Sequence, residues 1–436
     1  MNALVPPACQ WPRGPLNKLH EAACVGSVEL MGALLAEGSI DVNQGCPFGD
    51  TPLMIAADQG PPSMTKLLLS KSADASPAND EGCTALHFAA RKGRLAATRM
   101  LMKAGAKLES RTGQGLTPLH TAAAGGHAIV MRELIEAGAR VDNRMLNEQT
   151  PLYVAASGGH TDAVKELLRA KANPLLGPML APDETSTPLD SAAHGGHLEV
   201  LRELITWFRI AGRGGSNDVV RAVHVAVSKD RVDVMAVLFD GGLVDAGEVL
   251  LGSTLSGSAA CLKFLLQQQD HGNLAAYVNV FDHVGRTPLL CSVASGLCPP
   301  SFVRLLLDAG ADTTVAARFW MPREGGVFHG TPLAFAARSL RTKKVGGTSA
   351  TEKQLHELEG IRRLLLQAEA VHAVSWLWAS GSRCNANRTR RRCGTATLST
   401  QLRTMVPTMR RSAQARRVVL TTAFRLFLLR RYSTKP

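Results

Sequence analysis

The chain repeats itself every 33 residues, and this fixed period restricts its fold more than any other feature. TPLMIAA begins at Thr51, and TALHFAA, TPLHTAA and TPLYVAA begin 33 residues apart at Thr84, Thr117 and Thr150. Related phrases follow at Thr187, Thr287 and Thr331. A unit of this size cannot bury its own apolar face, so neighbouring units are expected to stack into a continuous core.

Each residue type has a physical role within one unit. Threonine caps a helix by accepting from a free backbone N–H, and proline suits the first helical position because its missing donor costs nothing there. Leucine and the Ala-Ala pair form a thin apolar face, and Gly126 or Gly159 ends the short helix with a positive φ. A second helix is predicted through Val130, Leu134 and Ile135, whose spacing places them on one face.

These motifs resemble the ankyrin repeat family, for which T-P-L-H-x-A at a period of 33 residues is a specific signature. The resemblance runs from about residue 16 to residue 370. It implies an all-α solenoid of stacked helix-turn-helix repeats with projecting hairpin loops. About ten units are predicted, and those near residues 221 and 248 are degenerate. A bend or a weakly stable region is therefore expected between about 210 and 270.

Three segments are predicted along the chain. Residues 1–15 form an N-terminal leader that is expected to be disordered, and residues 16–380 form the repeat domain. A polar loop at 341–354 interrupts the last repeat. Residues 381–436 form a basic tail that is expected to be disordered.

The net charge of +13 belongs to the tail. Residues 383–436 hold 14 of the 49 Lys and Arg and none of the 36 Asp and Glu, which leaves 35 basic and 36 acidic residues before them. The basic cluster at 388–392 is compatible with nuclear import, and the apolar segment at 416–431 lies between arginine pairs. As a helix, that segment would suit an anionic membrane surface or a calmodulin-like groove. A weak contact with nucleic acid is a further alternative, besides disorder.

No catalytic, metal-binding or cofactor-binding motif is present. The chain lacks the sequence patterns of phosphate-binding loops, dinucleotide sites, zinc proteases and nucleophile elbows. The resemblance assigns His87 and His120 to hydrogen bonds between loop and helix. The repeat spacing places His127, His160 and His197 at equivalent surface positions rather than around one ion. The chain is predicted to be no enzyme and to have no cofactor and no small-molecule substrate.

Cysteine usage bears on the compartment. Nine cysteines without a C-x-x-C pair favour free thiols in a reducing environment. The N-terminal residues make a poor secretory signal, and no stretch is long and apolar enough to span a bilayer. A cytoplasmic location is expected, and the basic tail leaves the nucleus open.

Candidate binding residues follow from the resemblance, because partners of this family usually contact hairpin tips and the exposed side of the first helix. Both sets vary between units while the repeat motif stays fixed. The tip residues are Asp80, Glu81, Gln114 and Asn147. The first-helix residues are Asp58, Gln59, Arg91, Lys92, Ser157 and His194.

The loop at 314–330 is a second candidate, because it is longer than its counterparts and rich in aromatics. An extended hairpin is predicted there, carrying Phe319, Trp320, Met321 and Phe328. Aromatic side chains on a projecting loop are typical anchors in protein interfaces. The alternative is that they fold back on the neighbouring repeat.

The function predicted from these features is a scaffold or adaptor that binds partner proteins. The alternative is a tether, in which the basic tail holds a membrane surface or nucleic acid while the repeats hold a cargo protein. Adaptors of the ubiquitin system are common in the family, but no C-terminal recruiting box is recognised here.

The first prediction concerns Trp320. The substitution Trp320→Ala should weaken partner binding by about 2 kcal/mol or more, because it removes an anchor that fills a pocket of the partner. The melting temperature should not change. A loss of thermal stability equal to the loss of binding would instead support a side chain folded onto the neighbouring repeat.

Overall fold

The computed structural model describes residues 17–385, apart from 38–39, 182–183, 245, 268–276, 283–284, 296–297, 322–325 and 346–351. The described residues form ten helix pairs, joined by loops and two short β-hairpins. Contacts divide the chain into unit 1, Met1–Asp245, and unit 2, Ala246–Pro436. The predicted all-α solenoid with projecting hairpin loops is confirmed. The leader at 1–16 and the tail at 386–436 lie outside the described residues.

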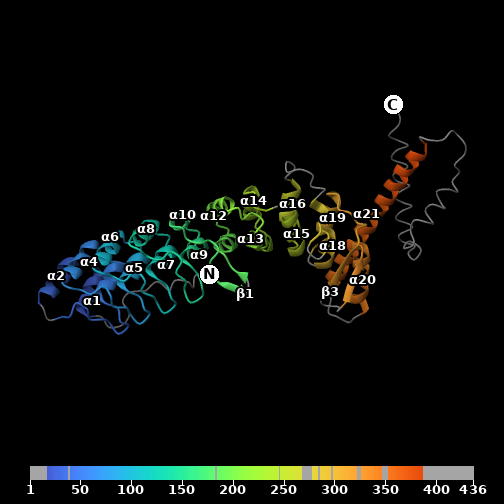
Figure 1. The fold of residues 1–436 in the computed structure, drawn as a ribbon. Coiled ribbons are helices and arrows are strands. Elements are labelled where there is room, and N and C mark those ends of the chain that lie inside the picture. The colour runs from blue at the N-terminus through green and yellow to red at the C-terminus, as the bar shows by residue number, and fades with distance from the viewer. Residues whose placement is uncertain are drawn as a thin grey trace, which may run out of the picture. The chain divides into compact units, whose positions relative to one another are not determined.

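Unit 1 holds seven helix pairs. Their first helices are α1 (Lys18–Val25), α3 (Pro52–Asp58), α5 (Ala85–Arg91), α7 (Pro118–Ala124), α9 (Pro151–Ser157), α11 (Pro188–Gly195) and α13 (Asn217–Ser228). Their second helices are α2 (Val28–Ala36), α4 (Pro62–Ser70), α6 (Leu95–Lys103), α8 (Ala128–Glu136), α10 (Thr161–Arg169), α12 (Leu198–Ile210) and α14 (Val232–Asp240). Each first helix contacts the next first helix, and each second helix contacts the next second helix, so the pairs stack in two rows (Figure 1).

The threonines cap the first helices as predicted. The hydroxyl oxygen of Thr51 accepts from the amide of Met54 at 3.4 Å, and that of Thr150 accepts from Tyr153 at 3.3 Å. The first repeat lacks this threonine, and the side-chain oxygen of Asn17 accepts from the amide of His20 at 3.0 Å instead. A different residue type therefore supplies the same cap.

The core lies between neighbouring repeats. Both alanines of the Ala-Ala pair are fully buried in α3, α5, α7, α9 and α11. On α8, Val130 and Leu134 are buried as expected, whereas Ile135 is half-buried and Met131 takes its place in the core. Methyl-sized side chains on the first helices let adjacent pairs approach closely, and the longer side chains of the second helices fill the remaining space.

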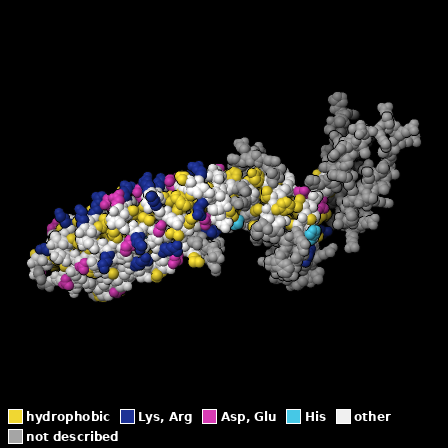
Figure 2. Space-filling view, in the orientation of Figure 1, with side chains coloured by type: hydrophobic (Ala, Val, Ile, Leu, Met, Phe, Trp, Pro, Cys, Tyr) yellow, Lys and Arg dark blue, Asp and Glu magenta, His cyan; other side chains and the backbone are white. Residues whose placement is uncertain are grey.

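Ion pairs connect the second helices of unit 1 across the repeats. They join Arg99 to Glu133 at 2.5 Å, Arg132 to Glu166 at 2.6 Å and Lys165 to Glu203 at 3.5 Å. Lys and Arg side chains, with Asp and Glu among them, line the second helices (Figure 2). Exposed pairs of this kind stabilise a protein by about 0–1 kcal/mol each. They follow the repeat spacing and add little to the stability that apolar burial provides.

Unit 2 holds three helix pairs. They are α15 (Ala246–Ser256) with α16 (Ala259–Gln267), α18 (Pro288–Ser295) with α19 (Pro300–Asp308), and α20 (Pro332–Val345) with α21 (Glu352–Asn385). The repeats near 221 and 248 lack most of the motif, yet both form helix pairs. The boundary between the two units falls between them. The bend or weakly stable region expected there stays a prediction.

The last repeat differs from the sequence expectation. Helix α20 continues to Val345 and α21 begins at Glu352, so helix covers both ends of the loop predicted at 341–354. The first glycines after Pro332 are Gly346 and Gly347, and nothing before them interrupts a helix. Helix α21 also includes 381–385, which were predicted to belong to the disordered tail.

Two loops contain short antiparallel hairpins. Strands β1 (Met179–Ala181) and β2 (Glu184–Thr185) precede α11 in unit 1. Strands β3 (Ala317–Met321) and β4 (Gly326–Gly330) precede α20 in unit 2, with Phe319 paired to Phe328. The extended hairpin predicted at 314–330 is therefore present. The side-chain surroundings of its four candidate anchors lie outside the described features.

The second prediction tests the turn that closes each second helix. Gly138 has a φ of 101°, and the equivalent Lys171 is held at a φ of 63°, where an L side chain is strained. The substitution Lys171→Gly should raise the free energy of unfolding by about 0.5–1 kcal/mol, after allowance for the greater freedom of glycine in the unfolded chain.

The reciprocal change Gly138→Lys should destabilise the protein by a similar amount. A Cβ at Gly138 would have no neighbour within 4 Å, so the loss would come from the backbone alone. Thermal unfolding of the full chain measures both effects. Shifts of the melting temperature in the same direction would contradict the strain argument.

Candidate functional site

The hairpin tips of unit 1 are joined into one ribbon by backbone hydrogen bonds between neighbouring repeats. The three amide-to-carbonyl bonds run from Asp80 to Phe48 (3.1 Å), from Gly113 to Glu81 (2.8 Å) and from Leu146 to Gln114 (3.1 Å). Each tip is thereby held in register with the next. Side chains on the ribbon are presented on a fixed backbone, which lowers the entropy lost when a partner binds.

Buried histidines attach the first helices to this ribbon. The backbone amide of Thr84 donates to Nδ1 of His87 at 3.1 Å, so the proton of the neutral ring is on Nε2. Nε2 then donates to the carbonyl oxygen of Leu116, in the next hairpin, at 3.1 Å. His120 repeats the arrangement with Thr117 and Gln149. The role that the resemblance gives to His87 and His120 is confirmed by these bonds.

A second set of histidines joins successive repeats at the opposite ends of the first helices. Nε2 of His127 is 2.8 Å from the carbonyl oxygen of Arg91, and His160 and His197 make the same contact at 3.0 Å with Ala124 and Ser157. These rings are half-buried. The prediction that they occupy equivalent positions in successive repeats is confirmed, and their exposure is only partial because each ring bonds to the preceding repeat.

The predicted binding residues fall into three groups by exposure. Asp80, Gln114 and Asn147 at the tips, and Gln59 and Lys92 at the ends of first helices, are exposed. Glu81, Ser157 and His194 are half-buried. A role of these residues in partner binding stays a prediction.

The expected exposure of Asp58 and Arg91 is wrong. Asp58 is only 4% exposed, and its Oδ1 lies 2.8 Å from Nη2 of Arg91, whose side chain is 13% exposed. The guanidinium also lies over the ring of Phe88, 5.1 Å from its centroid. The two residues occupy the same position in successive repeats, so stacking brings their opposite charges together. They belong to the contact between repeats.

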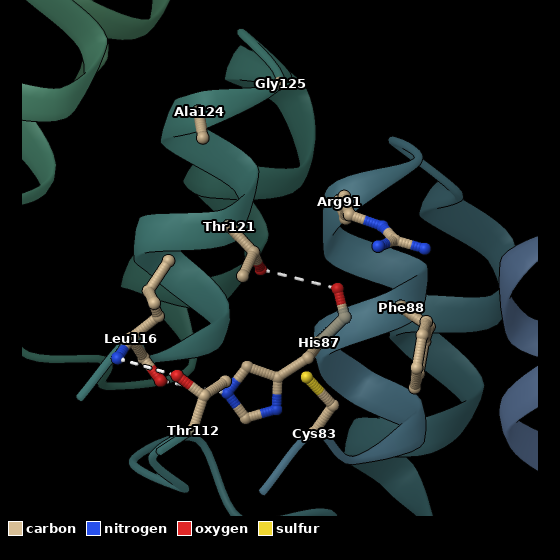
Figure 3. A pocket seen from close by; sticks show the side chains of 9 residues that line it. All are labelled: Cys83, His87, Phe88, Arg91, Thr112, Leu116, Thr121, Ala124 and Gly125. Atoms are coloured by element: carbon tan, nitrogen blue, oxygen red, sulfur yellow. Dashed lines mark hydrogen bonds between the residues drawn. The ribbon is translucent and has the colours of Figure 1, made fainter. Parts of the chain in front are cut away.

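A cleft of about 180 Å³ opens between α5 and α7 (Figure 3). Its lining residues are Cys83, His87, Phe88, Arg91, Thr112, Leu116, Thr121, Ala124 and Gly125. The walls are largely apolar, with Phe88 and Arg91 on one side and Ala124 and Gly125 on the other.

The cleft exists because one position on its wall holds a small residue. Ala124 stands at the repeat position that Arg91 occupies on α5, so the long side chain that would fill the space is missing. The sequence pattern contained this signal, namely an alanine where the other repeats carry Asp58, Arg91, Ser157 and His194. The cleft was not predicted, because the stacking of the repeats decides which residues of the adjacent repeat face this position.

Two exposed apolar residues on the ribbon were also missed. Phe48 is 45% exposed and Leu146 is 76% exposed, both at hairpin tips. Single exposed apolar side chains are common on protein surfaces. Here, however, both side chains lie on the ribbon that borders the cleft. Together they give unit 1 an apolar component on its hairpin side.

Within the described residues, no three His, Cys, Asp or Glu side chains come together as metal ligands would. No helix in the described part of the chain is long and apolar enough to cross a membrane. The described cysteines are free thiols, namely Cys24, Cys46, Cys83, Cys261, Cys291 and Cys298.

Stacked helix pairs with a hydrogen-bonded hairpin ribbon define a helical repeat protein of the kind that presents a surface to other proteins. Residues 19–112 and 105–177 match the family model for ankyrin repeats (3 copies), so ankyrin repeats are present over residues 19–177. No curated protein matches the chain. Ankyrin repeats generally mediate protein–protein interaction and are typically non-enzymatic modules.

The third prediction concerns pH. Burial lowers the pKa of both His87 and His120 to about 4, whereas these rings take up a proton near pH 6.5 in the unfolded chain. Their neutral form therefore stabilises the repeats fully above pH 6.5. This contribution decreases as the pH falls from 6.5 to 4, by up to about 1.4 kcal/mol per pH unit for each histidine.

The double variant His87→Asn and His120→Asn keeps an acceptor on each side chain and removes the titrating groups. It should be less stable than the parent at pH 7, but its melting temperature should fall less steeply between pH 6.5 and 4. All other titratable groups are the same in both proteins, so they contribute equally to the pH dependence of stability. An equal dependence on pH in both proteins would contradict this assignment.

Proposed function

We propose that this protein is a scaffold or adaptor that binds a partner protein along the hairpin ribbon and first helices of unit 1. The cleft between α5 and α7 is the observation that carries this proposal. It lies beside the ribbon, has largely apolar walls and results from Ala124, at a position that the repeat motif leaves free to vary. A partner would insert one apolar side chain there.

The surroundings of the cleft are suited to a polypeptide. Leu146 and Phe48 supply apolar contacts on the ribbon, and Gln114 and Asp80 supply exposed polar groups beside them. Interfaces of this kind combine a buried apolar centre with a polar rim. Lys92, exposed at the end of α5, favours a partner with an acidic residue near its apolar anchor.

The proposal includes no chemical reaction. The histidines of unit 1 that lie nearest the cleft donate to backbone carbonyls and hold the repeats together. The Nε2 atom of each of these rings is thus already engaged in a structural bond. The β3–β4 hairpin of unit 2, with Trp320, is proposed as a second contact with a protein partner. The tether formed by the basic tail remains the alternative.

The fourth prediction fills the cleft. The substitution Ala124→Leu should weaken partner binding about tenfold or more, because it occupies the space of one apolar side chain worth about 1.5–3 kcal/mol on burial. Ala104→Leu adds the same leucine at an exposed alanine after the second helix α6, away from the cleft and the candidate binding residues, and serves as the matched control. Partners captured by the three full-length baits from one cell extract are compared by quantitative mass spectrometry.

We expect specific partners to be retained by the parent and by Ala104→Leu but depleted with Ala124→Leu. Both variants should melt within a few degrees of the parent. Equal capture by all three baits would exclude the cleft as the binding site. Failure of the parent to enrich any protein over an unrelated repeat protein would count against the interaction function itself.

A further inference from the structure

Helix α12 is one turn longer than its neighbours. It has 13 residues, whereas α6, α8 and α10 each have nine. The Ala-Gly pair that closes the second helix follows Glu136 directly in α8, but in α12 it is delayed to Ala211-Gly212. Four additional residues add about 6 Å of helix. The end of α12 therefore projects beyond the ends of the helices stacked against it.

The additional turn exposes both apolar and basic side chains. Ile210 is 81% exposed, and Trp207 is half-buried with its ring edge-on to Phe208 at a centroid distance of 5.3 Å. Phe208 is fully buried and holds this turn on the core. Arg209 and Arg213 are exposed beside them. We define the α12 tip as Trp207, Arg209, Ile210 and Arg213.

More basic residues lie at the same ends of the neighbouring second helices. Residues 167–180 and 204–217 together hold four basic residues and no acidic residue. Among these four, Arg169 pairs with Glu166, whereas Lys171, Arg209 and Arg213 form no ion pair with any described residue. We define the basic edge as Lys103, Lys107, Arg140, Lys171, Arg209 and Arg213, all of them exposed.

Acidic side chains and helix C-termini beside the basic edge reduce its positive charge. Glu109, Glu136, Asp142, Glu166 and Asp240 are the acidic residues close to these helix ends in the sequence, and Glu166 offsets Arg169 at the end of α10. Each helix C-terminus adds about half a negative charge. The end of α12 carries Arg209 and Arg213 with no acidic residue in 204–217, so it stays positive after this subtraction.

We propose that the α12 tip and the basic edge dock on an anionic phospholipid membrane. Lys and Arg near such a surface are attracted to its negative headgroups, and Ile210 and Trp207 would enter the boundary between headgroups and acyl chains. The basic side chains extend over the ends of α6, α8, α10 and α12 in steps of about 10 Å, which suits a broad, flat partner. A nucleic acid would satisfy the charges and leave the exposed isoleucine without a contact.

This proposal is independent of the basic tail and of the cleft. It rests on the side chains of the α12 tip and the basic edge, all of them described by the structure, and none of these residues lines the cleft. A failure of membrane binding would leave the protein-binding function untouched.

The fifth prediction tests membrane binding with the full chain. Co-sedimentation is measured with vesicles of phosphatidylcholine alone and with vesicles containing about 30% phosphatidylserine. Binding should require the acidic lipid and decrease with salt. The triple variant Lys171→Gln, Arg209→Gln and Arg213→Gln should bind about 100-fold more weakly, because each basic residue contributes about fivefold. Ile210→Asp should lower binding about tenfold.

Matched controls use equally exposed residues away from the basic edge. Lys66→Gln, Lys92→Gln and Lys229→Gln together remove the same charge, and Ile129→Asp changes another isoleucine, 60% exposed near the start of α8. Both controls should bind like the parent. The tail is present in every protein, so its contribution cancels in the ratios.

Three outcomes would overturn the proposal. The first is equal binding of the parent to neutral and acidic vesicles. The second is an equal loss in the test variants and their controls, or no loss in either, which would assign the binding to net charge or to the tail. The third is tighter binding to a single-stranded oligonucleotide or an acidic peptide that the triple variant loses and Ile210→Asp keeps. Melting temperatures close to that of the parent establish that the variants are folded.

Discussion

Burial of the small-residue face of each first helix against the next repeat is the constraint on which the other features of the solenoid depend. The Ala-Ala pairs are fully buried, and no single helix pair could bury them alone. The close approach of neighbouring repeats then restricts which residue types can follow the first helix. A Cβ at Gly126 would lie 2.5 Å from Nδ1 of His160, and φ there is already 70°. The residues of Gly-Gly-His therefore act together, because the glycines leave space for the histidine ring that bonds to the preceding repeat.

The same contacts explain how repeats without the motif still fold. Arg94 stands at the position of His127, and its guanidinium donates to the carbonyl oxygens of Asp58 and Gly60. Arg221 stands at the repeat position of the capping threonine but lies inside α13, whose N-cap is Ser216, and its Nε donates to Asp190 of the preceding repeat at 2.7 Å. In both repeats a guanidinium of suitable reach supplies a contact to the preceding repeat. The residue type can change without loss of the helix pair, and α13 with α14 is the example.

The sequence predicted those structural features that depend only on residues within one repeat. Caps, helix pairs and glycine turns depend on neighbours in the chain, so the phrase around Thr117 predicts them. Prediction from the sequence failed for features that depend on contacts between side chains of different repeats. Asp58 and Arg91 look like two free polar residues until stacking brings them to 2.8 Å. The cleft depends on Ala124 and Phe88 lining the same space from neighbouring repeats, which the sequence of either repeat alone does not reveal.

A fixed set of packing residues therefore leaves the remaining positions free to shape the surface. Where Ala124 replaces a larger residue, the stack keeps its register and a cleft opens beside the ribbon. Where four residues are added before Ala211, Phe208 keeps the helix on the core and the additional turn projects. In both cases the change costs little stability, since neither alters the buried face between repeats. A repeat array can acquire a concave site and a projecting one independently, because each arises from positions that the packing does not use.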